Sequence, residues 1–303
     1  MDFKQLITFI EIVNLKSFSK ASKKMFLTQP TVTNHIQRLE EELGIVLFDR
    51  NGREITLTDA GFIFFNYAQE MVNLKDTAIH HLNSYKSKIE GTIEINSSSI
   101  PAQYILPYFV KDFNSHYPGV SFRIKQTDSK KVHNLLKEGF INFGIIGARY
   151  NYENIEYTKL IEDRLVLALP PSFKDIFSPY DTIDLQKLST LPLILREEGS
   201  GSRYLIEKNL KEIGFAAKKL NIISEVSSNE AIKKMIKLNI GSSFISELAI
   251  KEEIETGSII PVEVSDLVLE RNFYFICHKK RFLSPLNNTF KDFVLNNINK
   301  KIC

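Results

Sequence analysis

The stretch that decides the fold of this chain is "SFSKASKKMFLTQPTVTNHIQRLEEELG", which runs from Ser17 to Gly44. Its second half predicts a helix that begins after Thr28 and ends at Gly44, because threonine is a favoured N-cap, proline fits the first helical turn and glycine terminates helices. Valine, isoleucine and leucine recur along this helix at helical spacing and give it one buried face. A shorter helix capped by Ser17 precedes it, so the stretch predicts two helices joined by a tight turn.

The outward face of the second helix changes character along its length. Thr31, Asn34 and Arg38 come first, and the glutamates at 40–42 follow. A helix fits the major groove of DNA, where asparagine, glutamine, threonine and arginine side chains read base edges. Glutamates are repelled by phosphate, because both carry negative charge. We therefore expect the N-terminal half of this helix to lie in the groove and its acidic end to point away from the duplex.

Basic residues accompany the same stretch. From Lys16 to Arg38 there are five lysines or arginines and no aspartate or glutamate. The next segment, "IVLFDRNGREITLT", predicts a hairpin around Asn51–Gly52 that would form a wing beside the helices. Lysines and the N–H groups at helix starts bind phosphate and position a protein on DNA. The predicted DNA-binding residues are Lys20, Lys23, Thr28, Gln29, Pro30, Thr31, Thr33, Asn34, Arg38, Arg50 and Arg53. The alternative that these features leave open is a three-helix bundle with a solvated polar face.

Thr58 is the expected cap of a long helix. From Asp59 to about Lys88 there is no proline, Gly61 is the only glycine, and the apolar residues fall on one stripe. A helix of roughly 30 residues is about 45 Å long. Because nothing next to it in the sequence covers its apolar stripe, we expect it to pair with a second copy of the chain.

Beyond Gly91, strand-like and helix-like patterns alternate to the end of the chain. Such alternation is typical of an α/β domain with mostly parallel sheets. About 210 residues is large for one sheet, so we expect two subdomains with a cleft between them. The predicted domains are a DNA-binding domain at 1–58, a linker helix at 59–90 and a third domain at 91–303. Within the third domain, subdomain I covers 91–163 and 267–303, and subdomain II covers 164–266.

The composition is that of an ordinary globular protein. The 303 residues are 43% hydrophobic and 25% charged with a net charge of +3, so bulk charge gives no sign of a nucleic-acid partner. The two cysteines, Cys277 and Cys303, make no disulfide framework and no metal cluster, which fits a reducing cytosol. The start lacks the pattern of a signal peptide, and no apolar run reaches the roughly 18 residues of a membrane span. We expect a cytoplasmic protein with no membrane partner, bound metal or cofactor.

The stretch from Ser17 to Gly61 resembles the LysR-type transcriptional regulators. The matching positions are Ser17, Phe18, Ser19, Ala21, Gln29, Pro30, Ile36, Leu39, Glu40, Leu43, Gly44, Leu47, Phe48, Arg50, Leu57, Thr58, Ala60 and Gly61. Thr31, Thr33 and Asn34 depart from the residues common in that family, which affects base preference and leaves the fold unchanged.

The resemblance implies a fold of mixed class, with an α+β part followed by an α/β part. The parts are a winged helix-turn-helix, a linker helix that dimerises, and a two-subdomain effector domain like the type 2 periplasmic binding proteins. The implied partners are double-stranded promoter DNA, RNA polymerase, further copies of the chain in a homodimer or homotetramer, and a small effector.

In that family the effector lies in the cleft between the two subdomains, near loops and helix starts. The resemblance carries this site onto residues after the first two strands and onto the later segment "REEGSGSR". The implied effector-binding residues are Ser98, Ser99, Thr127, Arg196, Gly199, Ser200, Gly201, Ser202 and Arg203. Small residues and free N–H groups at a helix start bind anions, which favours a small anionic effector. The alternative is a tight turn capped by Ser200 or Ser202, with Arg196 and Arg203 paired to neighbouring glutamates.

Two other classes of function compete with a regulator. The C-terminal half by itself permits a cytoplasmic small-molecule-binding module without a transcriptional role, which the winged segment opposes. An enzyme needs a catalytic constellation, and no Ser-His-Asp, Cys-His or metal-ligand spacing is legible, so no catalytic residue is predicted. The segment from Gly199 to Ser202 lacks the lysine and the spacing of a nucleotide-binding loop. His133 and Cys277 are expected to have structural roles.

Overall fold

The computed structural model describes residues 1–49, 55–84, 89–279, 281 and 283–298. The chain divides into two compact units. The N-terminal unit comprises Met1–Glu90 and Lys280–Lys291, and the C-terminal unit comprises Gly91–Lys279 and Asp292–Cys303. None of the described helices combines the length and the apolar character that a membrane span requires.

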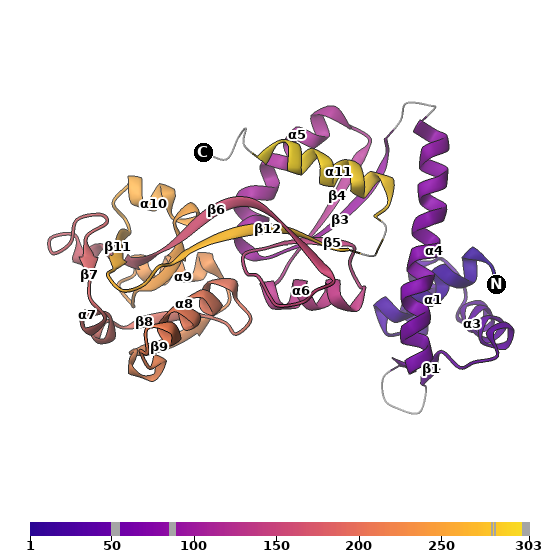
Figure 1. The fold of residues 1–303 in the computed structure, drawn as a ribbon, viewed down its shortest axis with the longest axis horizontal. Helices are drawn as coiled ribbons and strands as arrows, with labels where there is room; N and C mark the ends of the chain where they lie inside the picture. Colours follow the sequence, from indigo (N-terminus) through magenta and orange to yellow (C-terminus); the bar gives the residue numbers. More distant parts are fainter. Residues whose placement is uncertain (50–54, 85–88, 280, 282, 299–303) are drawn as a thin grey trace. The chain divides into compact units, whose positions relative to one another are not determined.

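The N-terminal unit contains the winged helix-turn-helix that the sequence predicts (Figure 1). Its elements are α1 (Phe3–Leu15), α2 (Phe18–Lys24), α3 (Gln29–Leu43), β1 (Phe48–Asp49), β2 (Thr56–Leu57) and α4 (Asp59–Ser84). The predicted caps are present, since Ser17 Oγ accepts from Lys20 N at 3.2 Å and Thr28 Oγ1 accepts from Thr31 N at 3.3 Å. Gly44 ends α3 with a left-handed φ of 67°, a conformation that glycine adopts without strain.

Aromatic side chains form the core of this unit. The ring centroid of Phe9 on α1 lies 5.2 Å from that of Phe48 on β1 and 5.2 Å from that of Phe64 on α4. β1 pairs antiparallel with β2, and Phe48 stands opposite Leu57. The predicted hairpin therefore has both of its strands, while its turn at 50–54 lies outside the described residues. Packing of these rings attaches the wing and the start of α4 to the three-helix bundle.

The long helix α4 starts in close contact with the DNA-binding fold. Thr58 Oγ1 accepts a hydrogen bond from Gly61 N at 2.9 Å, so Thr58 caps α4 as the sequence predicts. A Cβ atom at Gly61 would lie 2.1 Å from the carbonyl oxygen of Leu47, so this approach requires glycine. Apolar side chains that are 44–63% exposed follow on α4, namely Phe62, Ile63, Tyr67, Leu74 and Ile79. Pairing of α4 with a second copy stays a prediction, and the expected helix end near Lys88 lies outside the described residues.

The C-terminal unit has an eight-stranded sheet and a two-stranded sheet surrounded by helices (Figure 1). Its elements are β3 (Gly91–Ser97), η1 (Pro101–Ile105), α5 (Leu106–His116), β4 (Val120–Gln126), α6 (Ser129–Glu138), β5 (Phe143–Ile146), β6 (Ile155–Leu169), η2 (Pro171–Phe173), β7 (Thr182–Ile183), α7 (Leu185–Thr190), β8 (Leu193–Arg196), α8 (Gly201–Glu212), η3 (Ala217–Lys219), β9 (Ile222–Val226), α9 (Asn229–Lys237), β10 (Ser243–Ser246), η4 (Glu247–Ala249), α10 (Lys251–Glu255), β11 (Ile260–Val264) and β12 (Glu270–His278). The last helix, α11 (Pro285–Asn296), is divided between the two units after Lys291. The predicted alternation of strands and helices is present, with β7, α7, α10 and β11 as additional short elements.

The large sheet is mixed, so the expectation of mostly parallel sheets is wrong. β3 is parallel to β4 and β5, but β12 is antiparallel to β5 and β6, and β6 is antiparallel to β10 and β11. β6 carries the chain from one subdomain to the other and β12 brings it back, so the two strands run in opposite directions (Figure 1). The sequence pattern indicates a strand only from Arg164 onward, because four of the nine preceding residues of β6 are charged.

Each subdomain has its own apolar core. In subdomain I, Val132 of α6 packs with Ile146 of β5 and their neighbours. In subdomain II, Leu167 of β6 packs with Phe244 of β10 and their neighbours. β6 and β12 connect the two cores, which is the two-subdomain architecture expected from the sequence.

Candidate functional site

The outward face of α3 carries the side chains that are expected to read DNA. Asn34 and Arg38 are exposed, and no hydrogen bond or ion pair engages their side chains within the part of the chain that the structure describes. Thr33 differs, because its Oγ1 donates to the Gln29 carbonyl at 3.0 Å. Asn34 and Arg38 are therefore predicted residues of α3 whose side chains remain available to bases.

Lysines of α2 supply positive charge beside α3. Lys20 and Lys23 are exposed and have no ion pair among the described residues. Lys24, in contrast, pairs with Glu11 of α1 at 2.7 Å. The sequence alone does not separate these lysines, and the structure leaves Lys20 and Lys23 as the better candidates for phosphate contacts.

A hollow of about 360 Å³ lies next to the start of α3. It is lined by Ser17, Phe18, Ser19, Gln29, Thr33 and Ile55. The surface at the helix start is completed by Thr28, Gln29 and Pro30, which are exposed, and by Thr31, whose hydroxyl lies 2.8 Å from that of Thr28. Arg50 and Arg53 lie outside the described residues, so the wing contacts stay predictions.

Glu40 has a structural role that the sequence did not reveal. Its Oε1 accepts hydrogen bonds from the backbone N–H groups of Leu47 at 2.8 Å and Phe48 at 3.2 Å. The acidic end of α3 therefore does more than avoid phosphate, because one of its carboxylates holds the first strand of the wing. Glu42, near it, pairs with the N-terminal ammonium group of Met1.

In the C-terminal unit, loops and helix starts of both subdomains meet at a closed cleft. The cleft cavity is only about 10 Å³, and its lining residues are Ser98, Ser99, Ile100, Asp128, Ser129, Arg196, Ser200, Gly201, Ser202, Arg271 and Phe273. Six of the residues implied by the resemblance are in this lining. Asp128, Ser129 and Arg271 also belong to it but were not predicted, and nothing in the sequence near them indicates a site.

Arg196 is the buried cation of this cleft, with 5% of its surface exposed. Its guanidinium donates to both carboxylate oxygens of Glu197 at 2.8 and 2.9 Å, and its Nη1 donates to Asn229. Its Nη2 also donates to Ser99 Oγ of the other subdomain at 3.1 Å. The paired arrangement foreseen as the alternative is present, and the same side chain spans the cleft.

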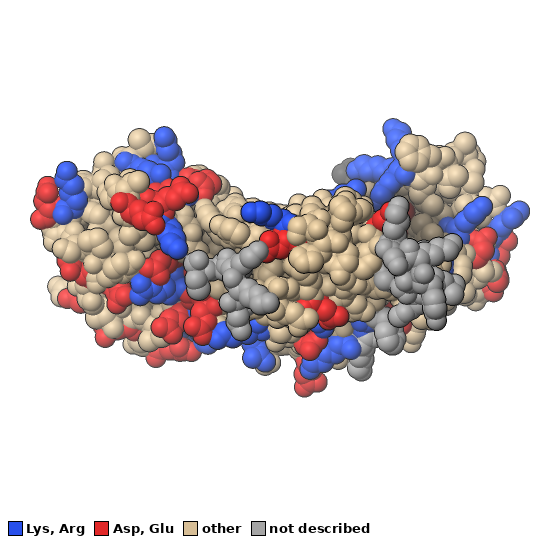
Figure 2. Space-filling model, turned by 90° about the horizontal axis from the view of Figure 1, so that it is seen from above, with Lys and Arg blue, Asp and Glu red and all other residues tan. Residues whose placement is uncertain are grey.

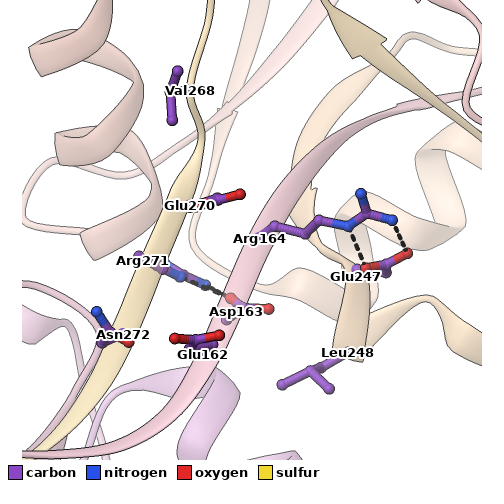
Figure 3. Close-up of a pocket in the computed structure, with 9 residues that line it drawn as sticks. All are labelled: Glu162, Asp163, Arg164, Glu247, Leu248, Val268, Glu270, Arg271 and Asn272. Atoms are coloured by element: carbon purple, nitrogen blue, oxygen red, sulfur yellow. Dashed lines mark hydrogen bonds and ion pairs between the residues drawn. The ribbon is translucent and has the colours of Figure 1, made fainter.

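A second buried ion pair lies next to the cleft, and one of its partners, Arg271, is part of the cleft lining. Asp163 of β6 is fully buried and Arg271 of β12 nearly so, and Arg271 Nε donates to Asp163 Oδ2 at 2.8 Å (Figure 3). Arg271 Nη1 donates to Ser202 Oγ at the start of α8 at 3.0 Å. Arg271 therefore joins the connecting strands to the helix that carries the predicted ligand-binding segment.

Two glycines permit the close approach of the subdomains. A Cβ at Gly199, where φ is 86°, would lie 2.7 Å from Asp128 Oδ1, and a Cβ at Gly201 would lie 2.9 Å from Ser129 Oγ. Lys130 N donates to the Gly199 carbonyl at 3.3 Å. The glycines of "REEGSGSR" thus allow close packing against the start of α6 while the cleft is closed.

Comparisons with known proteins agree with this architecture. The family model for the bacterial regulatory helix-turn-helix protein of the lysR family matches residues 3–62, and the LysR substrate binding domain matches residues 86–299. The chain belongs to the LysR family. It is 34% identical over 287 residues to an HTH-type transcriptional regulator of Methanocaldococcus jannaschii, covering 95% of this chain and 96% of the relative. It is 28% identical to a probable RuBisCO transcriptional regulator of Cyanophora paradoxa, covering 92% and 86% of the two chains.

Solved structures of LysR-family proteins share the fold at low identity. Full-length OxyR from Pseudomonas aeruginosa superposes with a TM-score of 0.76 at 18% identity, over 99% of this chain and 95% of that one. Full-length CbnR in complex with its target DNA has a TM-score of 0.60 at 21% identity, over 98% of this chain and 99% of that one. The regulatory domain of CcmR from Synechocystis has a TM-score of 0.62 at 19% identity, over 70% of this chain and 99% of that one. The family and the fold class predicted from the sequence are confirmed, and the chain is a LysR-type transcriptional regulator with an effector-binding domain.

Three residues of this LysR-type chain that the resemblance implied lie outside the cleft lining. Arg203 pairs with Glu207 at 2.7 Å and with Glu225, and these glutamates raise the pKa of its guanidinium. Thr127 is half-buried beside the cleft, and its backbone N–H donates to the Ser97 carbonyl at 3.0 Å. Gly199 contributes through the close packing described above. Their roles in effector binding stay predictions.

The surface charge of the C-terminal unit is mixed. Figure 2 shows lysine and arginine side chains interspersed with aspartate and glutamate over the part of this unit drawn in colour. This agrees with a net charge of only +3. The coloured part of this unit therefore shows no broad surface of one charge sign.

Proposed function

We propose that this LysR-type regulator binds double-stranded promoter DNA through α3 and the wing, and senses a small anionic metabolite in the cleft of its C-terminal unit. The observation that carries the proposal is the meeting of Arg196 and Arg271 with serine hydroxyls from both subdomains at the start of α8. The first N–H groups of a helix have no intrahelical partner, and in α8 the side chain of Ser200 does not cap them, so they are suited to an anion.

The cleft must open to admit an effector. A cavity of about 10 Å³ has room for about one water molecule. Opening separates Arg196 from Ser99 and Arg271 from Ser202, and a bound anion supplies acceptors that replace these contacts. A ligand that prefers one arrangement of the subdomains shifts the population toward it, which is how occupancy reaches the DNA-binding unit. One similar structure, the CcmR regulatory domain, is a complex with 2-PG, and this supports a ligand in the domain.

The DNA-binding part is tested by comparing two kinds of residue. Asn34→Ala should cost about 1–3 kcal/mol of binding free energy and relax specificity at one base position, because Asn34 is a free reading group on α3. Lys23→Ala should weaken binding to all sequences and flatten the dependence of affinity on salt, because a phosphate contact releases counterions.

Fluorescence anisotropy on specific and random duplexes over a range of salt concentrations separates these outcomes. Lys24→Ala is the matched control, since Lys24 is already paired with Glu11. An equal loss on both duplexes for Asn34→Ala would remove Asn34 from the base-reading set.

The cleft is tested by Ser99→Ala together with a thermal-shift screen of small anions. Ser99 is buried and bonds to Arg196, so the variant should lower the response to the effector and leave DNA binding without effector unchanged. Ser115→Ala, at an exposed serine of α5 outside the cleft, is the control. A normal effector response from Ser99→Ala would contradict the assignment of the cleft.

The assembly that we propose is a homodimer built on α4, or a tetramer made of two such dimers, with RNA polymerase as a further partner. The exposed apolar side chains of α4 support this arrangement, since such a stripe is stabilised by burial against a partner. Leu74→Glu places a charge in the stripe, and sedimentation should then show a smaller species. An unchanged sedimentation coefficient would place the interface elsewhere.

A further inference from the structure

The two strands that connect the subdomains have faces of different character. Their register places Asp163 opposite Arg271, Arg164 opposite Glu270, and Glu162 opposite Asn272. Because side chains alternate along a strand, Asp163 and Arg271 share one face of the two strands, and from this face Arg271 reaches Ser202 at the cleft. The side chains of Glu162, Arg164, Glu270 and Asn272 share the opposite face of the same two strands (Figure 3).

A pocket of about 520 Å³ is found at these strands. It is lined by Glu162, Asp163, Arg164, Glu247, Leu248, Val268, Glu270, Arg271 and Asn272. Its volume is within the range of roughly 300–1,000 Å³ that is typical of small-molecule sites. The cleft, by comparison, is closed to about 10 Å³ in the same structure. This pocket therefore has room for a small ligand while the cleft has none.

Negative charge is in excess around the single guanidinium of Arg164. Arg164 donates to both oxygens of Glu247 at 2.6 and 2.8 Å and to Glu263 at 3.1 Å, and Glu270 stands opposite it in the strand register. Hydrogen bonds from Arg164 lower the pKa of the Glu247 carboxyl, so Glu247 stays ionised at neutral pH. Glu247, Glu263 and Glu270 thus surround Arg164, and Lys251 is a second cation that acts on Glu247. Arg271 is paired with Asp163, and Glu162 has an exposed pair with Lys159. Four carboxylates and two guanidinium groups line the pocket, so its lining carries a net negative charge.

The rest of the lining combines an apolar rim with an unused acceptor. Leu248 and Val268 are apolar, and Val268 is 71% exposed. Asn272 Oδ1 is buried and has no hydrogen-bond partner among the residues that the structure describes. Buried acceptors are normally satisfied, so the site lacks a donor. We propose that this pocket is a second ligand site that takes a small organic amine, with its ammonium group toward the carboxylates and its hydrocarbon part against Leu248 and Val268.

Arg271 lines both the pocket and the cleft, and a continuous set of contacts joins the two. Ser202 at the cleft accepts from Arg271 at 3.0 Å, Arg271 bonds to Asp163 at 2.8 Å, and Ser246 donates to Asp163 Oδ1 at 2.7 Å. Ser246 directly precedes Glu247, which lines the pocket. Occupation of the pocket therefore alters the affinity of the cleft, and the effect is reciprocal. This coupling rests on the proposed function of the cleft, whereas amine binding does not.

Isothermal titration calorimetry on the full chain tests the site with 1,4-diaminobutane as the probe. Butane-1,4-diol and glutarate serve as neutral and anionic probes of similar length. We expect the diamine alone to bind at this pocket, and Glu270→Gln to weaken it about tenfold or more, because a charged hydrogen-bond partner is lost. Glu255→Gln, at an exposed glutamate of α10, is the control for general charge and should leave diamine affinity unchanged.

The possible results separate this site from the cleft. Absence of diamine binding at about 1 mM, or equal loss in the Glu270→Gln and Glu255→Gln variants, would overturn the amine site. Equal binding of glutarate that Glu270→Gln does not weaken would also overturn it. Ser99→Ala should leave diamine binding intact, so a failed cleft hypothesis and a failed amine site give different results. Circular dichroism of Glu270→Gln checks that the exposed substitution leaves the fold unchanged.

Discussion

Replacement of Glu40 tests whether the acidic end of α3 supports the wing. Glu40 accepts from the backbone N–H groups of Leu47 at 2.8 Å and Phe48 at 3.2 Å. Hydrogen bonds to a charged group contribute about 1.5–3 kcal/mol each, but the second bond is long and Glu40 is half-buried. We therefore expect Glu40→Ala to lower the free energy of unfolding by about 2 kcal/mol, and Glu40→Gln, which keeps a neutral acceptor, to lower it by about 1 kcal/mol.

The matched control is Glu41→Ala. Glu41 is exposed on the same turn, and its replacement by alanine removes the same charge. The chain has no tryptophan, so urea unfolding is followed by circular dichroism, with hydrogen exchange at Leu47 and Phe48 as the local measurement. Exchange at these two amides should rise in Glu40→Ala and stay low in Glu41→Ala. Equal stability and equal exchange in the two variants would refute a supporting role for Glu40. Both variants remove the same repulsion from phosphate, so any difference in DNA affinity reports on the wing. We expect Glu40→Ala to bind DNA more weakly than Glu41→Ala, because only Glu40 bonds to the first strand of the wing.

Two further predictions concern stability in each unit. Phe26 is 95% exposed with a left-handed φ of 55°, so Phe26→Asn should raise the free energy of unfolding by about 1 kcal/mol, and an unchanged urea midpoint would contradict this. Burial lowers the pKa of His133 below its ordinary value of about 6.5, so the unfolded chain binds a proton more readily than the folded one. Stability should be constant above about pH 6.5 and should fall as the pH drops through the folded pKa. His133→Phe, which keeps the ring packing against Tyr150, should lose this part of the pH dependence, and identical pH profiles would show that another group is responsible.

The helices of the N-terminal unit could be predicted from the sequence because their ends are marked by local sequence patterns. Ser17, Thr28 and Thr58 cap helices, and Gly44 ends one, because each of these roles depends on residues within one helical turn. The bond from Leu47 to Glu40 escaped prediction, because it joins a helix to a strand beyond a turn. The same limit applies to the orientation of sheet strands. Neither the pattern of β6 nor that of β12 shows which neighbour it pairs with.

The residues of the cleft were predicted only through the resemblance to the family. The segment "REEGSGSR" contains Arg196 and the start of α8, and it can be recognised because its residues are consecutive in the sequence. Arg271 and Asp163 are 108 positions apart, and each looks like an ordinary charged strand residue in the sequence. Arg203, implied together with Arg196, turns to Glu207 and Glu225 instead. Residues that share a motif need not face the same cavity, because side-chain direction depends on the helix and its partners.

The sequence by itself determined the winged helix-turn-helix, the long helix and the two-sided character of α3. These depend on period, caps and residue chemistry over a few turns, which the order of residues states directly. The tertiary structure alone decided that one glutamate of α3 holds the wing, that the cleft is closed, and that Arg271 stands between the cleft and a pocket on the connecting strands. Such features arise when segments far apart in the chain pack together. Which donor meets which acceptor is then set by the register of β6 and β12 and by the close contacts at Gly199 and Gly201.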